Sequence, residues 1–258
     1  GYREICELSD TLNYAAQELS KTEKLQRDLV ANISHDLRTP LTLITGYAEV
    51  MRDLPDENTP ENIQIIIDEA TRLSTLVNDV LDLSKLQAGV VSLKKRVYNL
   101  TSSVRGILTR YTKMTDYHIV FYASEEVYIC ADELKISQVI YNLVNNAMTY
   151  TGKDKSVVLR QRVEEGKVRI SVSDTGEGIP QDKLNDIWER YYKVDKAHKR
   201  AQVGTGLGLA IVKMILDLHG GAYGVQSREG IGSTFWFEMD TVTPPSPEEQ
   251  ALPDETAP

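Results

Sequence analysis

The sequence is poor in the residues that mark several classes of protein. Only two cysteines occur in 258 residues, Cys6 and Cys130. Their separation matches no metal-ligand spacing, so we assign them no chemistry and expect a reducing, cytoplasmic setting. No run approaches the roughly 18 apolar residues that a membrane-spanning helix needs, and Gly1 begins no signal-peptide pattern. We therefore expect the chain as given to be soluble, which is compatible with its being cut from a larger protein.

Basic residues are also in short supply. The chain has 29 Lys and Arg against 38 Asp and Glu, a formal net charge of -9. A face that binds nucleic-acid phosphates needs clustered Lys and Arg, and only short basic runs such as 94–96 occur. The composition therefore predicts no nucleic-acid partner. With 41% hydrophobic and 26% charged residues, it is typical of a soluble globular protein.

The first third of the chain predicts a helical hairpin. Apolar residues recur at helical spacing from Tyr2 to about Leu54. After the break "LPDENTPEN", Thr59 is expected to cap a second helix that opens at Pro60 and ends near Gly89. Two antiparallel helices bury little by themselves, so dimerisation into a four-helix bundle is the cheapest way to cover both apolar stripes.

Beyond Arg96 the pattern predicts a separate α/β domain. A hairpin over 156–174 is expected to turn at Glu165-Gly166. Helices are expected near 101–113, 133–150, 181–191 and 205–219, and further strands near 118–122, 127–131, 222–227 and 233–239. The last residues combine prolines with four acids and no base, which is typical of a disordered tail.

Three glycine-bearing segments in this second half suggest a nucleotide site: "DTGEGI" (174–179), "GTGLGLAIVK" (204–213) and "EGIGSTF" (229–235). A glycine-rich turn that runs into a helix leaves backbone N–H groups and the positive end of the helix dipole free for phosphate oxygens. The segment "GTGLGL" matches neither the P-loop nor the dinucleotide fingerprint. Taken singly, each cluster is explained as well by ordinary turns.

A pair of asparagines also indicates a nucleotide site. Asn142 and Asn146 lie four residues apart on one face of the expected helix 133–150. Their side-chain carbonyls are suitable ligands for Mg²⁺, and satisfied polar contacts are the alternative for an isolated pair.

The combination is more specific than its parts. In order and spacing, "NLVNNA", "DTGEGI", "IWERYYKVD", "GTGLGLAIVK" and "GSTFWF" resemble the ATP-binding domain of sensor histidine kinases, a left-handed Bergerat-type α/β sandwich, and "SHDLRTPLT" resembles their phospho-acceptor helix. The resemblance covers about Thr22 to Asp240. Residues 1–20 resemble the closing helix of a HAMP linker module, with a generic coiled-coil entry helix as the alternative.

The resemblance implies an α+β protein, in which an antiparallel helical hairpin that forms a four-helix bundle in a homodimer is followed by the α/β sandwich. It implies an entry helix over 1–21, a dimerisation and phosphotransfer hairpin over 22–90, a linker over 91–97, an ATP-binding domain over 98–241 and a tail over 242–258. It further implies a full-length protein anchored in the membrane through a preceding part, with this core on the cytoplasmic face.

The same resemblance implies the chemistry. His35 attacks the γ-phosphate of ATP, Asp36 orients the imidazole or draws its proton, and the phosphoryl group passes to an aspartate in the receiver domain of a response regulator. Thr39 is implied to orient the water that dephosphorylates that regulator. Pro40 is expected to kink the helix just beyond the histidine.

In the nucleotide domain, Asn146 and Asn142 are implied to hold Mg²⁺ and Asp174 to accept a hydrogen bond from the adenine amino group. Tyr150 is implied to pack on the adenine. The remaining implied contacts to ATP are Gly176, Gly178, Lys193, Gly204, Gly206, Leu207 and Gly208.

Two positions depart from the family pattern. Thr149 stands where a Lys is common, and "YYKVD" replaces the usual "FYRVD", so that Lys193 offers a charge without the bidentate fork of Arg. Phosphate contact can draw instead on Lys196, Lys199 or Arg200. One alternative function is an ATPase of the Hsp90, gyrase or mismatch-repair kind, or a protein serine kinase. Another is a phosphatase-dominant or non-catalytic signalling scaffold.

Overall fold

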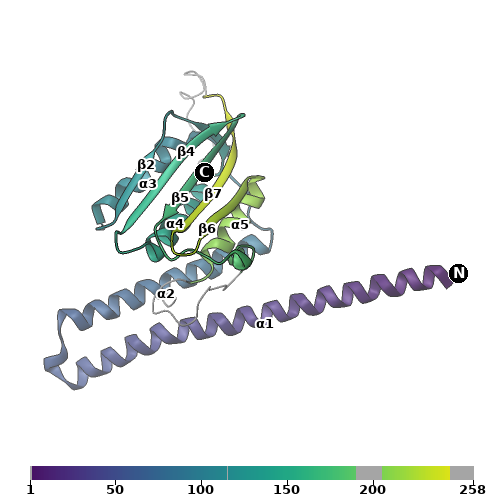
Figure 1. The fold of residues 1–258 in the computed structure, drawn as a ribbon. Helices are drawn as coiled ribbons and strands as arrows, with labels where there is room; N and C mark the ends of the chain where they lie inside the picture. The colour runs from purple at the N-terminus through teal and green to yellow at the C-terminus, as the bar shows by residue number, and fades with distance from the viewer. Residues whose placement is uncertain (1, 115, 190–204, 245–258) are drawn as a thin grey trace, which may run out of the picture. The chain divides into compact units, whose positions relative to one another are not determined.

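The computed structural model describes residues 2–114, 116–189 and 205–244, and it divides into two compact units, Gly1–Asn78 and Asp79–Pro258 (Figure 1). None of the helices in these described ranges is long and apolar enough to cross a membrane.

A helical hairpin opens the chain, and its second helix begins in the first unit and ends in the second. Helix α1 (Tyr2–Asp53) is unbroken through Pro40, and a short 3₁₀ turn, η1 (Pro55–Glu57), leads to α2 (Pro60–Gln87). The Asn62 N–H donates to Thr59 Oγ1 at 3.2 Å, so the predicted cap at Thr59 is confirmed. The predicted end near Gly89 is confirmed as well, because Gly89 has φ of +63° and donates its N–H to the Leu86 carbonyl at 3.3 Å.

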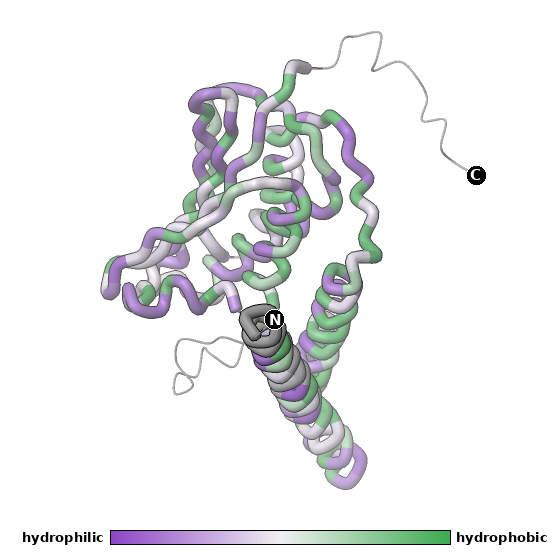
Figure 2. Tube along the Cα trace, turned by 90° about the vertical axis from the view of Figure 1, so that its right-hand side faces the viewer, coloured by the Kyte–Doolittle hydropathy of each residue, from purple (hydrophilic) through white to green (hydrophobic). Residues whose placement is uncertain are grey.

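Apolar side chains follow both helices of the hairpin, and hydrophobic residues recur along α2 in Figure 2. Leu76 is buried, whereas Leu41 and Ile67 keep 55% and 50% of their surface exposed. Other large hydrophobic side chains share this exposure, among them Val50, Ile63 and Val77. A single hairpin therefore leaves apolar surface uncovered, as the sequence pattern predicts.

The second unit is a seven-stranded sheet with helices on one face (Figure 1). The strands are β1 (Arg96–Asn99), β2 (His118–Tyr122), β3 (Tyr128–Ala131), β4 (Ser156–Glu164), β5 (Lys167–Asp174), β6 (Ala222–Arg228) and β7 (Gly232–Val242). The helices are α3 (Leu100–Met114), α4 (Glu133–Tyr150) and α5 (Gly208–His219). The sheet order is β1-β3-β7-β5-β4-β2, with β6 on β7. The β2–β4 pair is parallel, and the other pairs are antiparallel.

The core lies between the sheet and these helices. Along β5, Val168, Ile170 and Val172 are buried while Lys167 and Arg169 are exposed, the alternation of a strand with one covered face. The helices contribute fully buried side chains to the same core, including Leu143, Val144, Ile211 and Ile215. The α+β class and the helix-on-sheet sandwich expected from the sequence are confirmed.

Three predicted elements were wrong in detail. In place of a helix over 181–191, the described part of that segment has two short 3₁₀ turns, η2 (Gln181–Lys183) and η3 (Asp186–Trp188). Trp188 anchors η3 with its ring centroid 4.8 Å from that of Tyr223. Helix α5 begins at Gly208 rather than 205 because Gly206 has φ of +70°, which no right-handed helix accepts. Strand β1 begins within the predicted linker 91–97. With four residues, the strand is too short to show a clear alternation of apolar and polar side chains in the sequence.

A buried polar pair joins α3 to the sheet. Thr101 is fully buried, and its Oγ1 donates to Gln161 Oε1 at 2.9 Å and accepts from the Val127 N–H at 2.9 Å. Gln161 in turn donates to the Glu125 carbonyl at 2.9 Å. The hydroxyl therefore satisfies groups that have no access to water.

We predict that Thr101→Val lowers the free energy of unfolding of the second unit by about 1–3 kcal/mol, because it leaves buried polar groups unpaired at nearly constant volume. Urea unfolding followed by tryptophan fluorescence measures this, since both tryptophans, Trp188 and Trp236, belong to that unit. The control is Thr109→Val, an exposed threonine on the same helix. Equal losses in the two variants would contradict the buried role of Thr101.

Candidate functional site

The predicted nucleophile lies on the solvent side of α1. The His35 side chain keeps 78% of its surface exposed, and its Nδ1 is 3.1 Å from Asp36 Oδ1. Asp36 therefore reaches round the helix to its neighbour. With Nδ1 directed at a carboxylate, Nε2 is the ring nitrogen left facing outward.

Thr39 and Pro40 follow one turn later. Thr39 is exposed, and its Oγ1 donates to the His35 carbonyl at 3.4 Å, so the two residues share one helix face. Pro40 is buried and lies inside the helix. Because proline has no N–H, the Asp36 carbonyl loses its usual partner four residues on. The helix is continuous here, and the kink stays a prediction.

In the second unit, α4 carries the two candidate asparagines. The helix is capped by Asp132, whose side chain accepts from the Lys135 N–H at 3.2 Å. Asn142 Nδ2 donates to the Gly208 carbonyl at 3.3 Å, which links α4 to the first residue of α5. Asn146 is half-buried one turn later on the same helix face. The first and fourth of the predicted motifs, "NLVNNA" and "GTGLGLAIVK", are therefore brought together.

Asp174 ends β5 with its side chain almost enclosed, at 8% exposure. Its Oδ1 accepts from the N–H groups of Gly176 at 2.9 Å and Ser233 at 3.3 Å. Burial raises the pKa of Asp174 above its ordinary value, and these two backbone hydrogen bonds oppose the rise. A buried carboxylate held by amides is suited to accept a further hydrogen bond from a ligand.

Backbone segments crowd around Asp174. A Cβ at Gly176 would lie 2.1 Å from the Tyr150 carbonyl oxygen, and one at Gly178, where φ is +75°, would lie 2.2 Å from the Arg228 carbonyl oxygen. A Cβ at Gly232, where φ is +130°, would lie 2.2 Å from the Asp174 carbonyl oxygen. These three positions accept no side chain without moving backbone, which is why the end of α4, the end of β5 and the β6–β7 turn meet here.

The glycine segment 204–213 is described only from Thr205 onward. Gly206 has φ of +70°, and Gly208 opens α5, where backbone N–H groups have no intrahelical partner. The Leu207 side chain is fully buried, so Leu207 could reach a ligand only through its backbone. Predicted contacts Lys193 and Gly204, with Lys196, Lys199 and Arg200, lie outside the described residues.

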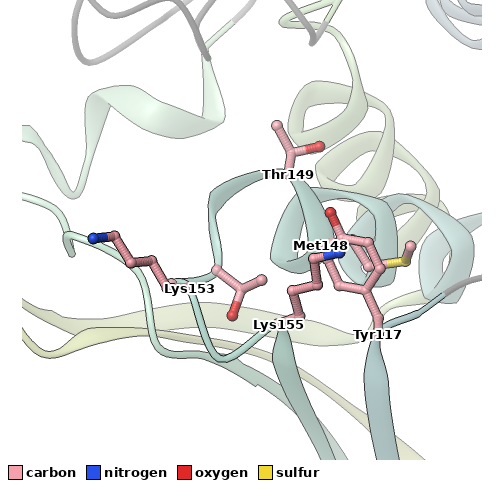
Figure 3. Close-up of a pocket in the computed structure, with 7 residues that line it drawn as sticks. Tyr117, Met148, Thr149, Lys153 and Lys155 are labelled. Carbon is pink, nitrogen blue, oxygen red and sulfur yellow. The ribbon is translucent and has the colours of Figure 1, made fainter.

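Tyr150, the last residue of α4, is 42% exposed. Beside it lies a pocket of about 470 Å³ lined by Tyr117, Met148, Thr149, Thr151, Gly152, Lys153 and Lys155 (Figure 3). None of the predicted ligand residues lines this pocket. Thr149 Oγ1 donates to the Asn145 carbonyl at 2.8 Å, and Lys153 extends away from Tyr117 and Lys155 in Figure 3. The pocket flanks the candidate site and is distinct from it.

Sequence reasoning missed a hydroxyl network behind the "DTGEGI" turn. Thr151 Oγ1 lies 3.0 Å from Thr175 Oγ1, which donates to Asp154 Oδ1 at 2.5 Å. These contacts fix the loop after α4 against the residue that follows Asp174. Gly232 was also missed as an individual position. Isolated threonines carry no spacing signal, and only the three-dimensional structure reveals such a network.

The donor set suits a nucleotide with a hard cation. Within the described ranges, no group of three or more His, Cys, Asp or Glu side chains could hold a metal ion by itself. Asn142 and Asn146 offer amide oxygens on one face of α4, a fit for Mg²⁺ that takes its other ligands from phosphates and water. The arrangement can therefore bind a base at Asp174 and phosphates beside the asparagines and the start of α5.

Comparison with known proteins matches two separate stretches of the chain to family models. The family model "His Kinase A (phospho-acceptor) domain" matches residues 25–89, and "Histidine kinase-, DNA gyrase B-, and HSP90-like ATPase" matches residues 131–243. The sensor protein SrrB of Staphylococcus aureus is 35% identical over 225 residues, which is 84% of this chain and 38% of SrrB. The chain thus spans well under half the length of the curated relatives that it matches.

Solved structures agree. The catalytic domain of histidine kinase ThkA is 30% identical, covering 57% of this chain and 97% of that one, with a TM-score of 0.50. A complex of ThkA with response regulator protein TrrA is 28% identical over 83% of this chain and 61% of that one, with a TM-score of 0.67. Full-length ShkA bound to AMPPNP is 30% identical over 85% of this chain and 47% of that one, with a TM-score of 0.61.

The fold and the matched models define a protein that joins a phospho-acceptor helical hairpin to an ATP-binding α/β sandwich. The chain belongs to the sensor histidine kinase family.

We predict that Asp174→Asn unfolds with a higher free energy than the natural chain at neutral pH, because the amide removes a buried charge and keeps an acceptor for both N–H groups. Burial raises the pKa of Asp174 above 3.8, so the native carboxyl takes up its proton before the unfolded one as pH falls. The natural chain then gains stability, and the difference should narrow toward about pH 4.

Urea unfolding at several pH values measures this difference. The assignment of Asp174 as a costly buried charge would be contradicted if the variant had a lower free energy of unfolding than the natural chain at neutral pH and this difference grew as pH falls.

Proposed function

We propose that this chain is the core of a sensor histidine kinase that phosphorylates its own His35 from ATP and passes the phosphoryl group to an aspartate of a response regulator. The observation that carries the proposal is the pairing of the exposed His35 ring with Asp36 through Nδ1. This geometry leaves Nε2 with a lone pair directed to solvent, which is what an attacking nitrogen requires.

In the proposed reaction, Nε2 of the neutral His35 ring attacks the γ-phosphorus of ATP. The bond from that phosphorus to the β,γ-bridging oxygen breaks, and ADP leaves with the bond electrons. The positive charge that develops on the ring is stabilised by the Asp36 carboxylate at Nδ1, which can accept the Nδ1 proton. The products are ADP and Nε2-phosphohistidine.

For the nucleotide, we propose that Asp174 accepts a hydrogen bond from the adenine amino group, with Tyr150 packing on the base. Gly176 and Gly178 admit the base because they carry no side chain. Gly206, Leu207 and Gly208 offer backbone N–H groups to the phosphates, and we extend this backbone role to Gly204 on the family pattern. On the same pattern, we propose that the side chain of Lys193 supplies a positive charge to the γ-phosphate.

We propose that Mg²⁺ is held by Asn146, supported by Asn142, together with phosphate oxygens and water. When bound, Mg²⁺ would neutralise charge on the transferring phosphates. The role of this chain is to fix the two amide oxygens: α4 is capped by Asp132, and Asn142 is tethered to the Gly208 carbonyl at 3.3 Å.

The proposed assembly is a homodimer through a four-helix bundle, supported by the exposed apolar residues of the hairpin and by the match of 25–89 to the phospho-acceptor family model. The solved ThkA complex with TrrA supports a response regulator as partner. We propose the layout of entry helix 1–21, hairpin 22–90, linker 91–97, ATP-binding domain 98–241 and tail 242–258.

We further propose that the full-length protein carries a HAMP-type module and a membrane anchor ahead of this core, which would then act at the cytoplasmic face of the membrane. Thr39, on the face of His35, supports a second proposal: that the hairpin also positions the water that dephosphorylates the partner regulator.

We predict that His35→Gln abolishes labelling by γ-³²P-ATP while nucleotide binding is kept, because glutamine has no comparable nucleophilic nitrogen. Labelling in the natural chain should be acid-labile and base-stable, which separates it from a serine kinase. The matched control is His118→Gln, an exposed histidine on β2, which should label normally. A His35→Gln protein that still became labelled would reject the assignment.

We predict that Asn146→Asp loses both nucleotide binding and labelling, by at least about tenfold, or about 1.4 kcal/mol. A carboxylate there repels the phosphates. The control is Asn145→Asp, one residue away, because Asn145 Oδ1 accepts from the Tyr111 hydroxyl at 2.7 Å and a carboxylate can do the same. Titration with a fluorescent ATP analogue measures nucleotide binding by the two variants, and incubation with γ-³²P-ATP measures their labelling. Equal effects at the two positions would remove Asn146 from the site.

A further inference from the structure

A histidine outside the proposed site bridges two helices of the second unit. His219 is the last residue of α5, and its Nδ1 lies 2.8 Å from the Ile215 carbonyl oxygen. Its Nε2 lies 3.1 Å from the backbone nitrogen of Asp132. A carbonyl only accepts and a backbone N–H only donates. Both bonds therefore form only in a neutral ring that carries its proton on Nδ1.

Asp132, at the other end of this bridge, makes hydrogen bonds to several segments. Asp132 caps α4 by accepting from the Lys135 N–H at 3.2 Å through Oδ1. Its Oδ2 accepts from the Lys94 N–H at 2.9 Å. Lys94 belongs to the segment 88–95 that leads from α2 to β1, and the next pair along the chain, Arg96 and Glu133, forms an ion pair. One residue thus joins α5, α4 and the segment 88–95.

The groups around the ring shift the pKa of His219 in opposite directions. Burial lowers the pKa of His219 below its ordinary value of 6.5. The Lys95 ammonium adds to this effect, whereas the Ile215 carbonyl and the Asp132 carboxylate oppose it. Desolvation outweighs the attraction, so the native state favours the neutral ring that the geometry requires.

We propose that His219 is a proton-sensitive bridge: a proton taken from solvent onto Nε2 removes its only lone pair, breaks the hydrogen bond from the Asp132 N–H and loosens the segment 88–95 together with the start of α4. Two N–H groups would then face each other across that contact. Since α4 carries Asn142 and Asn146, acidification would reduce the order of the nucleotide site without touching a residue that contacts ATP.

The direction in which stability changes with pH follows from the difference between the pKa of His219 in the native and the unfolded chain. The unfolded chain takes up a proton at His219 near pH 6.5, before the native state does. Stability contributed by the neutral bridge is therefore complete above about pH 6.5 and is lost progressively as pH falls below it. This places the switch at mildly acidic pH, where histidine titrates.

The direct test follows the backbone amide resonances of Asp132 and Lys94 in the full chain from about pH 8 to about pH 5, the range in which histidine titrates. We expect both to move in a single titration with a midpoint below that of an exposed histidine. In His219→Gln, which can donate to Ile215 and accept from Asp132 at any pH, the titration should be absent. His118→Gln should retain it.

Amides that stay unshifted across this range in the natural chain would overturn the proposal even if the variant fails to fold. So would a titration that persists in a folded His219→Gln protein.

The regulatory consequence rests on the proposed kinase function and has its own readout. Between about pH 7.5 and about pH 5, across the range in which histidine titrates, we expect the initial rate of autophosphorylation to fall further in the natural chain and His118→Gln than in His219→Gln. If the autophosphorylation rates of the natural chain and of His219→Gln fell equally while the amide titration was confirmed, the link between the bridge and activity would be overturned. Absence of any phosphorylation would instead count against the proposed function, and the amide titration would still decide the bridge.

Discussion

The second unit depends on how closely its backbone segments approach around one buried carboxylate. Asp174 is enclosed at 8% exposure and held by two backbone N–H groups. Glycines at 176, 178 and 232 let three carbonyl-bearing segments come within a distance that a Cβ would block. The carboxylate is costly to bury, and the packing of β5, the end of α4 and the β6–β7 turn holds it there. Stability is given up at this point for a fixed acceptor at which a base can be recognised.

The proposed phosphate end is organised by helix termini rather than by a dedicated loop. Asn142 ties α4 to the first residue of α5, so this asparagine lies beside the N-terminus of α5. The start of α4 is in turn fixed by Asp132, which also receives the segment 88–95 and the ring of His219. The same helix thus carries the proposed Mg²⁺ ligands at one end and a junction with a titratable group at the other.

Local pattern predicted most of the elements. The cap at Thr59, the end at Gly89 and the hairpin over β4 and β5 follow from rules that act within a few residues. The elements that were wrong depend on distant partners or on strand length. The 3₁₀ turns at 181–188 are fixed by Trp188 against Tyr223, and β1 is defined by its pairing with β3. The candidate residues came from motif order, whereas the exposure of His35, the enclosure of Asp174 and the threonine network required coordinates.

The proposed function requires that His35 carries a phosphoryl group taken from ATP. The most direct measurement is mass spectrometry of the protein after incubation with ATP and Mg²⁺, with digestion kept at neutral to basic pH so that a phosphoramidate survives. Trypsin releases residues 28–38 between Arg27 and Arg38, with His35 as the only histidine in that peptide. We expect one phosphoryl group on this peptide, assigned to His35 by fragmentation. Phosphate on a serine or threonine, on another histidine, or on no residue at all would contradict it.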